Sequence, residues 1–374
     1  MNRTHSIGIK RPSALVVENL SKRFRGKPAL DGVSFEVPKA SLTVILGPAG
    51  TGKTTTLRLI AGLDRPDSGR VLLFGEDVGR WEPKDRNISM IFDNLALYPN
   101  KTGFENIASP LIIRRESKQE IEKKVEEMAG ILKISHILKR LPRTMSGGER
   151  QRIALGRALI RSPNLFLLDE PLSSLDAKLR IELRTELKRL QRDLGYTFVL
   201  ATPDYTEAMA IADTVVMLHQ GRAVQVAEPQ ELYDKPIDRE TACFVGAPQI
   251  NLVDASYEPN GNGGYIKVAE ARLPAPPHLQ RAFSSGVRDF ELGIRPEHLR
   301  MGDPSRAQIR SRLVDIEPLG LKSVLTVQTS AVELRLLVKS KETREFSIGQ
   351  NMGIETTDSS MFLAFDRTTG RRIA

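Results

Sequence analysis

The stretch "LTVILGPAGTGKTTTLRLIAGL", residues 42–63, decides the fold of this chain. Its apolar start, "LTVIL", is typical of a buried strand, and the apolar residues after the glycines recur at helical spacing. A glycine-rich loop between such a strand and such a helix is the setting of a P-loop, which binds nucleotide phosphates. An accidental glycine-rich turn would lack this setting, so the sequence predicts a nucleotide-binding α/β domain.

The composition of the loop "GPAGTGKTT" (47–55) supports this prediction. Its glycines let the backbone pass close to the phosphates, and the N–H groups at the start of a helix attract anions. We expect Lys53 to reach the β- and γ-phosphates and the Thr54 hydroxyl to bind Mg²⁺. The residues expected to contact ATP in this loop are Gly47, Pro48, Ala49, Gly50, Thr51, Gly52, Lys53, Thr54 and Thr55.

A second apolar run ends on two acidic residues. The segment "NLFLLDEP" (164–171) predicts a buried strand that closes with Asp169 and Glu170. Carboxylates are costly to bury unless they serve a cation or a reaction. We expect Asp169 to hold Mg²⁺ through its oxygens and Glu170 to polarise the attacking water as a general base.

A second candidate anion site lies in "MSGGERQR" (145–152), directly before apolar residues at helical spacing. Ser146, Gly147 and Gly148 would present a hydroxyl and N–H groups at the start of a helix. A single chain has no evident need of two phosphate sites.

Composition limits the class of protein. The chain has 374 residues, 40% of them hydrophobic, which is enough for two or three domains. Its apolar runs are far shorter than the roughly 18 to 20 residues of a membrane span, and no secretory signal is expected. The single cysteine, Cys243, excludes an internal disulfide and a clustered thiolate metal site. The net charge is +9, but acidic residues are mixed with the basic ones, as in "ESKQEIEKKVEE" (116–127), so we expect a solvated surface and no nucleic-acid partner.

The pattern of apolar and polar residues changes near residue 245. Residues 1–245 alternate apolar runs with helical patterns, which predicts a mixed or parallel sheet covered by helices. Within this part, residues 95–160 lack strand patterns and predict a helical subdomain. Residues 246–374 contain short β-type runs separated by turn signals, which predicts a β-barrel-like C-terminal domain.

These motifs, in this order, resemble the nucleotide-binding subunit of an ATP-binding cassette (ABC) transporter, and the resemblance covers nearly the whole chain. It is closest to the ATPase subunits of bacterial carbohydrate importers, which carry a C-terminal regulatory β domain. In that family two subunits face each other head to tail, and each ATP lies between the P-loop of one and the "SGG" signature of the other. The resemblance therefore implies that Ser146, Gly147, Gly148 and Glu149 contact ATP bound by a partner.

The resemblance assigns further roles by position. Phe24 matches an aromatic ring that stacks on adenine, with an ordinary core ring as the alternative. The segment "SSLD" (173–176), which ends in Asp176, matches the loop that communicates between the two ATP sites, and "LYPNKTGFENI" (97–107) matches a stretch that contacts a helix of the membrane subunit. In the C-terminal part, "GIRPEHL" (293–299) matches the importer-type extension, whose role is either regulatory or limited to steadying the dimer.

Three positions depart from the family pattern. Pro203 stands where relatives have a histidine that hydrogen-bonds the γ-phosphate, and proline has neither a side-chain donor nor a backbone N–H. Loss of one such donor commonly costs about 2.7–4 kcal/mol, a factor of roughly a hundred to a thousand in rate. Asp93 replaces a glutamine that touches Mg²⁺; aspartate still ligates a hard cation, but it is shorter and adds negative charge beside the triphosphate. Glu149 replaces another glutamine, which is a milder change.

We therefore expect an asymmetric heterodimer. The chain would bind MgATP at its own P-loop and hydrolyse it poorly, while its signature completes a competent site on a second, non-identical ATPase subunit. A slow but self-sufficient homodimer is the alternative, and the retained Glu170 counts in its favour. A non-transport ATPase of the DNA-maintenance type is disfavoured, because sustained coiled-coil heptads are absent from the sequence.

The resemblance also implies the biological setting. It predicts a bacterial importer of a sugar, a polyol such as glycerol, or a glycerol phosphate. Two transmembrane permease subunits and an extracytoplasmic solute-binding protein would complete it, and the chain would lie at the cytoplasmic face of the inner membrane. The pocket that selects the solute is not expected in this chain.

Overall fold

The computed structural model describes residues 12–373, except 93–94, 174–175, 261–262, 284–285, 287 and 331. Its contacts divide the chain into two compact units, Met1–Pro229 and Gln230–Ala374. The domain boundary expected at residue 245 stays a prediction, because compactness does not measure independent folding. Among the described residues, no helix combines the length and apolar character needed to cross a membrane.

The first unit is built on a six-stranded mixed sheet of order β10-β9-β3-β8-β7-β6. Strands β3, β7 and β8 are buried along their whole length, as their unbroken apolar runs predict. Within the part of the chain that is described, β10 alone pairs antiparallel in this sheet. The strands are β3 (Leu42–Leu46), β6 (Ile88–Ile91), β7 (Leu165–Asp169), β8 (Phe198–Thr202), β9 (Thr214–His219) and β10 (Arg222–Ala227).

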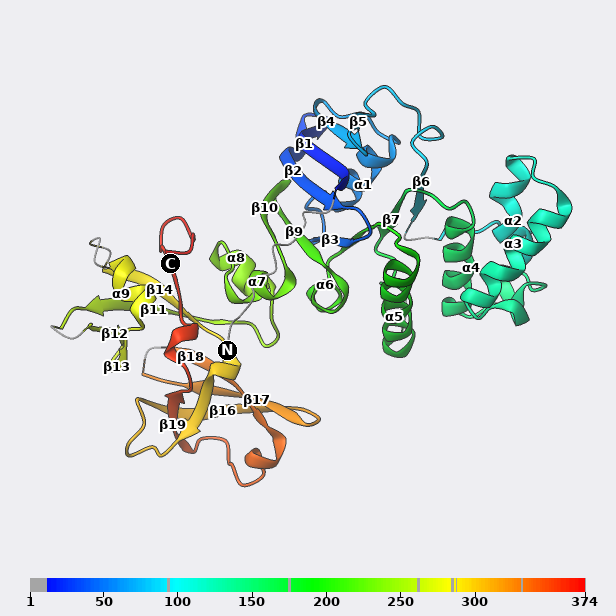
Figure 1. The fold of residues 1–374 in the computed structure, drawn as a ribbon. Helices are drawn as coiled ribbons and strands as arrows, with labels where there is room; N and C mark the ends of the chain where they lie inside the picture. The colour runs from blue at the N-terminus through cyan, green and yellow to red at the C-terminus, as the bar shows by residue number, and fades with distance from the viewer. Residues whose placement is uncertain are drawn as a thin grey trace, which may run out of the picture. The chain divides into compact units, whose positions relative to one another are not determined.

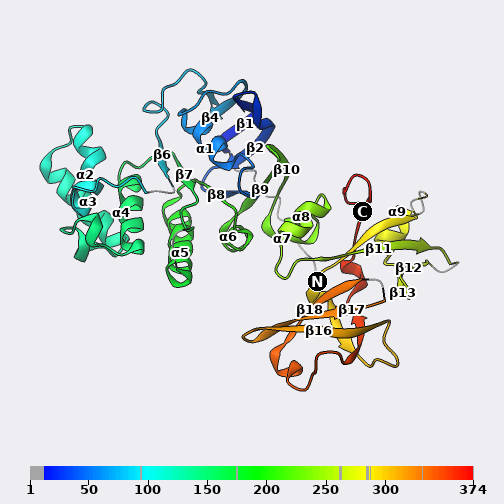
Figure 2. The ribbon, with the colours of Figure 1, turned by 180° about the vertical axis from the view of Figure 1, so that it is seen from behind.

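Helices cover both faces of this sheet. Helix α1 (Lys53–Ala61) lies between it and an antiparallel sheet of order β2-β1-β4-β5, and the three layers share one apolar core (Figure 1). Helices α5 (Ala177–Leu194) and α6 (Tyr205–Ile211) cover the opposite face (Figure 2). The antiparallel sheet consists of β1 (Ser13–Phe24), β2 (Lys27–Pro38), β4 (Ser68–Leu73) and β5 (Glu76–Asp77).

A helical segment follows β6 and lies to the side of the sheet (Figures 1 and 2). Each of its three α-helices begins with a capping box, in which a serine or threonine and a glutamate three residues later satisfy each other's N–H groups. The helices are α2 (Gly103–Ile113), α3 (Lys118–Ile131) and α4 (Gly147–Leu159), with one-turn helices η1 (Ser135–Ile137) and η2 (Pro142–Thr144) between them.

The second unit contains two five-stranded antiparallel sheets over one apolar core. Asn251 joins the sheets, because its amide donates to the carbonyls of Ile294 at 3.1 Å and Arg335 at 2.9 Å and accepts from the Arg335 N–H at 2.7 Å. One sheet has the order β13-β12-β11-β14-β20, with β11 (Asn251–Glu258), β12 (Tyr265–Val268), β13 (Ala271–Pro274), β14 (Asp289–Ile294) and β20 (Leu363–Phe365). The other has the order β15-β19-β16-β17-β18, with β15 (Leu299–Gly302), β16 (Ile309–Leu319), β17 (Lys322–Gln328), β18 (Glu333–Lys339) and β19 (Asn351–Thr356).

Short helices complete this unit, and the motif "GIRPEHL" fastens two of them to the sheets. The buried Arg295 stacks on the Tyr233 ring at 3.6 Å and donates to the carbonyls of Tyr233 and Val245, both at 2.6 Å. Tyr233 in turn donates its hydroxyl to Glu297. The helices are α7 (Pro229–Asp234), α8 (Arg239–Phe244), α9 (Pro277–Phe283), η3 (Pro296–His298), η4 (Ser340–Thr343) and η5 (Ser359–Met361).

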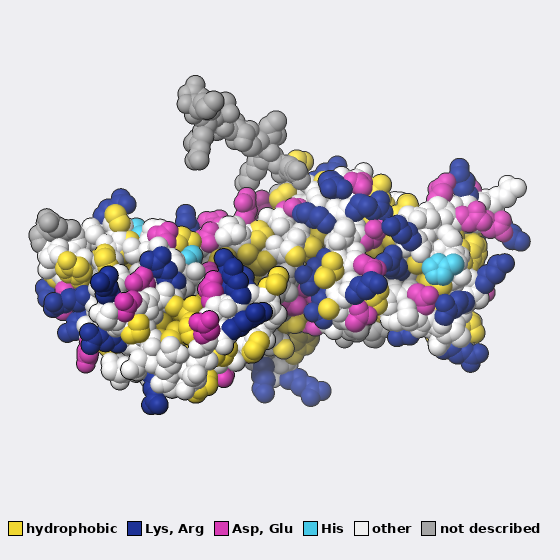
Figure 3. Space-filling view, turned by 90° about the horizontal axis from the view of Figure 1, so that it is seen from below, with side chains coloured by type: hydrophobic (Ala, Val, Ile, Leu, Met, Phe, Trp, Pro, Cys, Tyr) yellow, Lys and Arg dark blue, Asp and Glu magenta, His cyan; other side chains and the backbone are white. Residues whose placement is uncertain are grey.

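The fold class is as predicted: a mixed sheet with a helical subdomain, followed by a β-rich C-terminal part. The surface drawn in Figure 3 intersperses lysine and arginine with aspartate and glutamate. Charges on that face are therefore distributed as on a solvated surface.

Candidate nucleotide site

Three loops of the first unit meet at the carboxyl edge of the six-stranded sheet. Strand β8 lies between β3 and β7, with Leu46 opposite Thr202 and Asp169 opposite Ala201. The P-loop follows β3, Glu170 follows β7, and Pro203 follows β8. Ligands of open α/β sheets bind at this edge, so the topology gathers the predicted phosphate machinery in one place.

The P-loop depends on glycine at two positions where the chain leaves no room for a side chain. A Cβ atom on Gly47 would lie 2.1 Å from the carbonyl oxygen of Leu218. Gly52 has a φ of +100°, and a Cβ there would lie 2.6 Å from the carbonyl oxygen of Ala29. The Thr51 hydroxyl donates to the Pro48 carbonyl at 2.9 Å, which closes the loop before α1 begins.

Lys53 lies inside this loop and is 4% exposed. Its ammonium group donates to the carbonyls of Gly47 and Pro48, both at 3.0 Å, and lies 3.7 Å from a Glu170 carboxylate oxygen. Burial lowers the pKa of Lys53 below its ordinary value, while Glu170 and Asp169 oppose this shift. The ammonium group is therefore held in a desolvated place beside two acids that favour its charged form.

Thr54 and Asp169 form a pair of hard oxygen donors. The Thr54 hydroxyl donates to an Asp169 carboxylate oxygen at 3.1 Å, and Asp169 is almost fully buried at the end of β7. A hydroxyl and a carboxylate side by side suit Mg²⁺, which fills its other positions with water and phosphate oxygens. The residues present therefore fit the predicted magnesium site. Asp93, the third predicted ligand, lies outside the described residues.

Glu170 has an unusual backbone conformation. Its φ is +46°, a left-handed value that a residue with a Cβ rarely adopts. The Ala201 carbonyl accepts from its N–H at 2.9 Å, and the Ser173 hydroxyl donates to its carbonyl at 2.9 Å. Strained residues held in this way cluster at functional sites, and the side chain remains about one-third exposed. Glu170 is thus fixed by its backbone while its carboxylate stays accessible to water.

Pro203 is exposed directly after β8. It contributes no N–H and no polar side chain, so the predicted gap in γ-phosphate recognition falls at the carboxyl end of the strand beside the P-loop strand. Phe24, at the end of β1, is 46% exposed and has the Lys22 ammonium 5.5 Å from its ring centre. An exposed ring of this kind is suited to stacking and differs from an ordinary core ring.

The signature segment presents its own helix start to solvent. Ser146 caps α4, accepting from the Glu149 N–H at 3.3 Å, and its own N–H donates to the Glu149 carboxylate at 2.7 Å. The Ser146 N–H, together with Arg140 at 3.1 Å, holds the pKa of Glu149 below its ordinary value. Glu149 therefore places a full negative charge at the site, and Arg140 offsets part of it.

The loop that ends in Asp176 leads into α5. Asp176 caps this helix by accepting from the Leu179 N–H at 3.0 Å. Residues 174 and 175 of the predicted communication loop lie outside the described residues. The capping bond explains why an aspartate follows that loop.

Two contacts of α4 were not expected from the sequence. Arg157 donates to the carbonyls of Ala96 at 2.8 Å and Leu95 at 2.9 Å, so it holds the segment after β6. Gln151, which is 3% exposed, donates to the carbonyl of Pro171, the residue after Glu170. A polar residue on the apolar stripe of α4 is the single sequence feature that marks Gln151. Nothing in the sequence marks Arg157.

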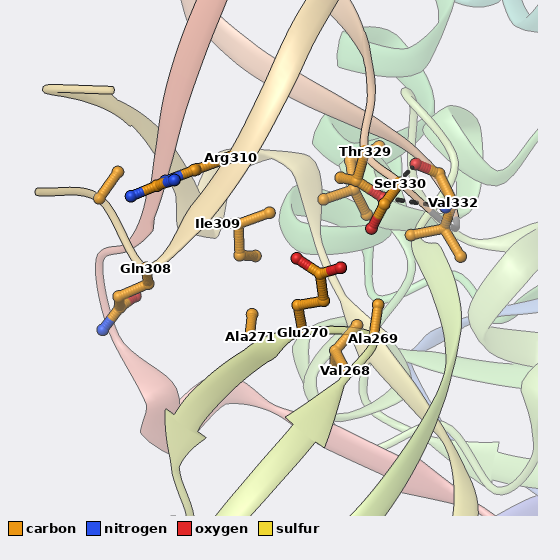
Figure 4. Close-up of a pocket in the computed structure, with 12 residues that line it drawn as sticks. Val268, Ala269, Glu270, Ala271, Gln308, Ile309, Arg310, Thr329, Ser330 and Val332 are labelled. Atoms are coloured by element: carbon orange, nitrogen blue, oxygen red, sulfur yellow. Dashed lines mark hydrogen bonds between the residues drawn. The ribbon is translucent and has the colours of Figure 1, made fainter. Parts of the chain in front are cut away.

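A cavity of about 240 Å³ in the second unit is a competing candidate site. Glu270 points into it from the turn between β12 and β13, with Thr329 and Ser330 on another wall (Figure 4). Glu270 and Arg310 are both exposed, so water solvates their charges. Across the described residues, none of the buried polar atoms left without a partner lines this cavity. We therefore take the loops of the first unit as the candidate nucleotide site.

Fold and site together define a P-loop nucleotide-binding cassette. Residues 30–173 match the ABC transporter family, and residues 292–363 match the TOBE domain. The sn-glycerol-3-phosphate import ATP-binding protein UgpC of Cereibacter sphaeroides is 39% identical over 96% of this chain and 99% of its own length. The trehalose/maltose import ATP-binding protein MalK of Thermococcus litoralis is 38% identical over 94% of this chain and 97% of its own.

Solved structures agree with these sequence relatives. The cbiO1 protein of Clostridium perfringens, part of the ABC transporter complex cbiONQ, has a TM-score of 0.55 at 26% identity and covers 59% of this chain and 91% of its own. A dimeric ATP-binding cassette bound to ADP and Pi has a TM-score of 0.53 at 27% identity, covering 57% of this chain and 98% of its own. The chain belongs to the family of ABC transporter ATP-binding proteins. The resemblance noted from its motifs is thereby confirmed.

Proposed function

We propose that the chain energises an ABC importer of a sugar, a polyol or a glycerol phosphate by binding and hydrolysing MgATP. The observation that carries this proposal is the convergence of Lys53, Thr54, Asp169 and Glu170 at one sheet edge. The names of the relatives, which import sn-glycerol-3-phosphate or trehalose and maltose, support the solute class.

Each residue of the candidate site has its own role in ATP hydrolysis. Lys53 and the P-loop N–H groups neutralise and hold the phosphates, and Thr54 and Asp169 would hold Mg²⁺, which supplies charge neutralisation for the leaving phosphate. Glu170 orients water and accepts its proton. Phe24 would stack on adenine. Pro203 supplies no donor to the γ-phosphate, so hydrolysis at this P-loop is slow.

The exposed signature supports a dimeric arrangement. Ser146 is exposed at the start of α4, with Gly147 half-buried and Gly148 buried behind it, and an anion bound at this helix start would come from a second chain. We infer that this signature completes the site of a non-identical ATPase subunit, while the intact Lys53 and Glu170 pair leaves a slow homodimer as the competing arrangement.

Separate glutamate-to-glutamine changes test the asymmetry. In the complex reconstituted with its membrane subunits, Glu170→Gln should lower ATPase turnover less than twofold. The same change in the partner subunit should lower it by at least about 100-fold, the usual contribution of a general base. Equal losses, or full turnover from this chain with membrane subunits alone, would reject the heterodimer and support the homodimer.

A cavity between β6, α2 and α4 is suited to the membrane subunit. Its volume is about 370 Å³, and its wall combines apolar side chains with four cations. Burial lowers the pKa of Arg161, and nearby Arg114 adds to the shift. The sides of the cavity include Tyr98, from the segment expected to contact a membrane-subunit helix, and Ile113, which is 77% exposed. We infer that a helix with apolar and acidic side chains docks here, at the cytoplasmic face of the membrane.

Replacing Ile113 with aspartate should break this contact. The change removes an apolar contact and places a carboxylate beside the cations that the docking helix would engage. We therefore expect at least about tenfold less membrane subunit to co-purify and transport to fall in parallel, since burying an isoleucine side chain contributes about 1.5–3 kcal/mol and each 1.4 kcal/mol is tenfold in affinity. Ile112→Asp is the matched control, because Ile112 is 54% exposed on the same helix but does not line the cavity. Equal losses from both variants would mean that the membrane subunit does not dock in this cavity. MgATP affinity should be unchanged in both.

A further inference from the structure

A buried carboxylate lies next to the turn that carries Pro203. Glu207 on α6 is 2% exposed, and it accepts a hydrogen bond from the Thr202 hydroxyl at 2.7 Å. Burial raises the pKa of Glu207, and the Thr202 bond partly opposes the shift. An acidic side chain is costly to bury at such a place, and no step of the hydrolysis described above uses it.

The Thr202 hydroxyl connects Glu207 to both sides of residue 203. While it donates to Glu207, it accepts from the Asp204 N–H at 3.1 Å. Asp204 then caps α6 by accepting from the Thr206 N–H at 2.8 Å. The turn between β8 and α6 is thus fixed by one hydroxyl whose orientation Glu207 sets, and this holds for any side chain at position 203.

A second link joins this turn to α5. A guanidinium nitrogen of Arg180 lies 3.5 Å from an Asp204 carboxylate oxygen, and its Nε lies 3.9 Å from a Glu207 carboxylate oxygen. Arg180 is in the first turn of α5, and its N–H donates to the carbonyl of Asp176 at 2.9 Å. The turn after β8 and the helix that begins at Asp176 are therefore tied through one arginine.

We propose that Glu207 is a positioning residue of the ATPase reaction: through Thr202 it fixes residue 203 at the sheet edge, and through Arg180 it joins that turn to the start of α5. This inference rests on the proposed function. Because the network contains no atom of the residue 203 side chain, it persists although position 203 holds proline. A donor restored at this position would therefore be held where it can act.

The test compares one network variant in two backgrounds. Thr202→Val keeps the side-chain shape and removes both hydroxyl bonds, whereas Thr202→Ser retains them. Each is made in the full-length chain with Pro203 and with Pro203→His. The kcat and KM for MgATP are measured in the complex with membrane subunits, with the partner's own site inactivated so that turnover reports this chain's P-loop site. We expect Thr202→Val to lower kcat about tenfold with histidine at 203, because misplaced groups lose catalytic effect steeply. The loss with Pro203 should be several-fold smaller, KM should not change, and Thr202→Ser should restore kcat.

A merely structural role predicts a different pattern. Equal fold losses of kcat in both backgrounds would overturn the positioning inference and leave the proposed function intact. If Pro203→His itself brings no gain, both the impaired site and the positioning inference fail. Glu207→Gln is the second variant, should Thr202→Val fold poorly. It keeps an acceptor for the Thr202 hydroxyl but removes the charge facing Arg180, and its loss of kcat with histidine at 203 should be intermediate.

Discussion

Lys53→Ala should weaken MgATP binding by about 30-fold or more. Its ammonium group is buried beside Glu170 and inside a loop whose carbonyls it already orders. Removing one partner of a buried charge interaction costs about 2–5 kcal/mol, and each 1.4 kcal/mol is tenfold in affinity. The variant also leaves the carbonyls of Gly47 and Pro48 without their donor, so a local loss of order in the P-loop adds to the loss of affinity.

The measurement is calorimetric titration of MgATP into the full-length chain, well below the unfolding temperature of the variant. Lys39→Ala is the control, since Lys39 is an exposed lysine of the same unit outside the P-loop. It should bind MgATP as the native chain does. Nucleotide affinity within threefold of native for Lys53→Ala would mean that the P-loop of this chain does not hold the phosphates.

The parts of the site that the sequence predicts are those whose residues lie together in one continuous segment. Each of β3 and β7 is an apolar run ending in a chemically distinctive loop, so the P-loop and the pair Asp169 and Glu170 could be assigned to strand ends before the sheet order was known. The order itself, which puts β8 between them, brings Pro203 to the same edge. The sequences of parallel strands that lie far apart in the chain do not indicate which strands will pair with each other.

The parts that escaped prediction are contacts between distant segments. Glu207 resembles any acidic residue in the first turn of a helix, and only the packing of α6 against α5 buries it near Arg180. Arg295 likewise stands in a recognised motif, but its role in holding Tyr233 depends on where α7 returns. Charged residues whose partners lie tens of residues away have no local pattern, because their burial is set by tertiary structure.

Pro203→His should raise the rate of ATP hydrolysis at this chain's own P-loop by roughly 100- to 1000-fold. A donor to the charge that develops on the γ-phosphate is commonly worth about 2.7–4 kcal/mol. The position is exposed and follows a strand, so an imidazole has room there, and Asp204 beside it has the extended backbone that any residue adopts. The rate should be measured as single-turnover hydrolysis with the partner's own site inactivated, so that product release and the second site do not mask the gain.

Pro203→Ala separates the missing donor from the rigidity of proline. Alanine releases the ring and restores a backbone N–H, but it offers no side-chain donor. If the missing imidazole limits the reaction, Pro203→Ala should stay within about threefold of the native rate while Pro203→His rises far above it. Equal gains from both would mean that the fixed backbone of proline holds back the site, and the impairment would then lie in how the turn moves. Either gain is possible because the chain already has Glu170 as its candidate general base.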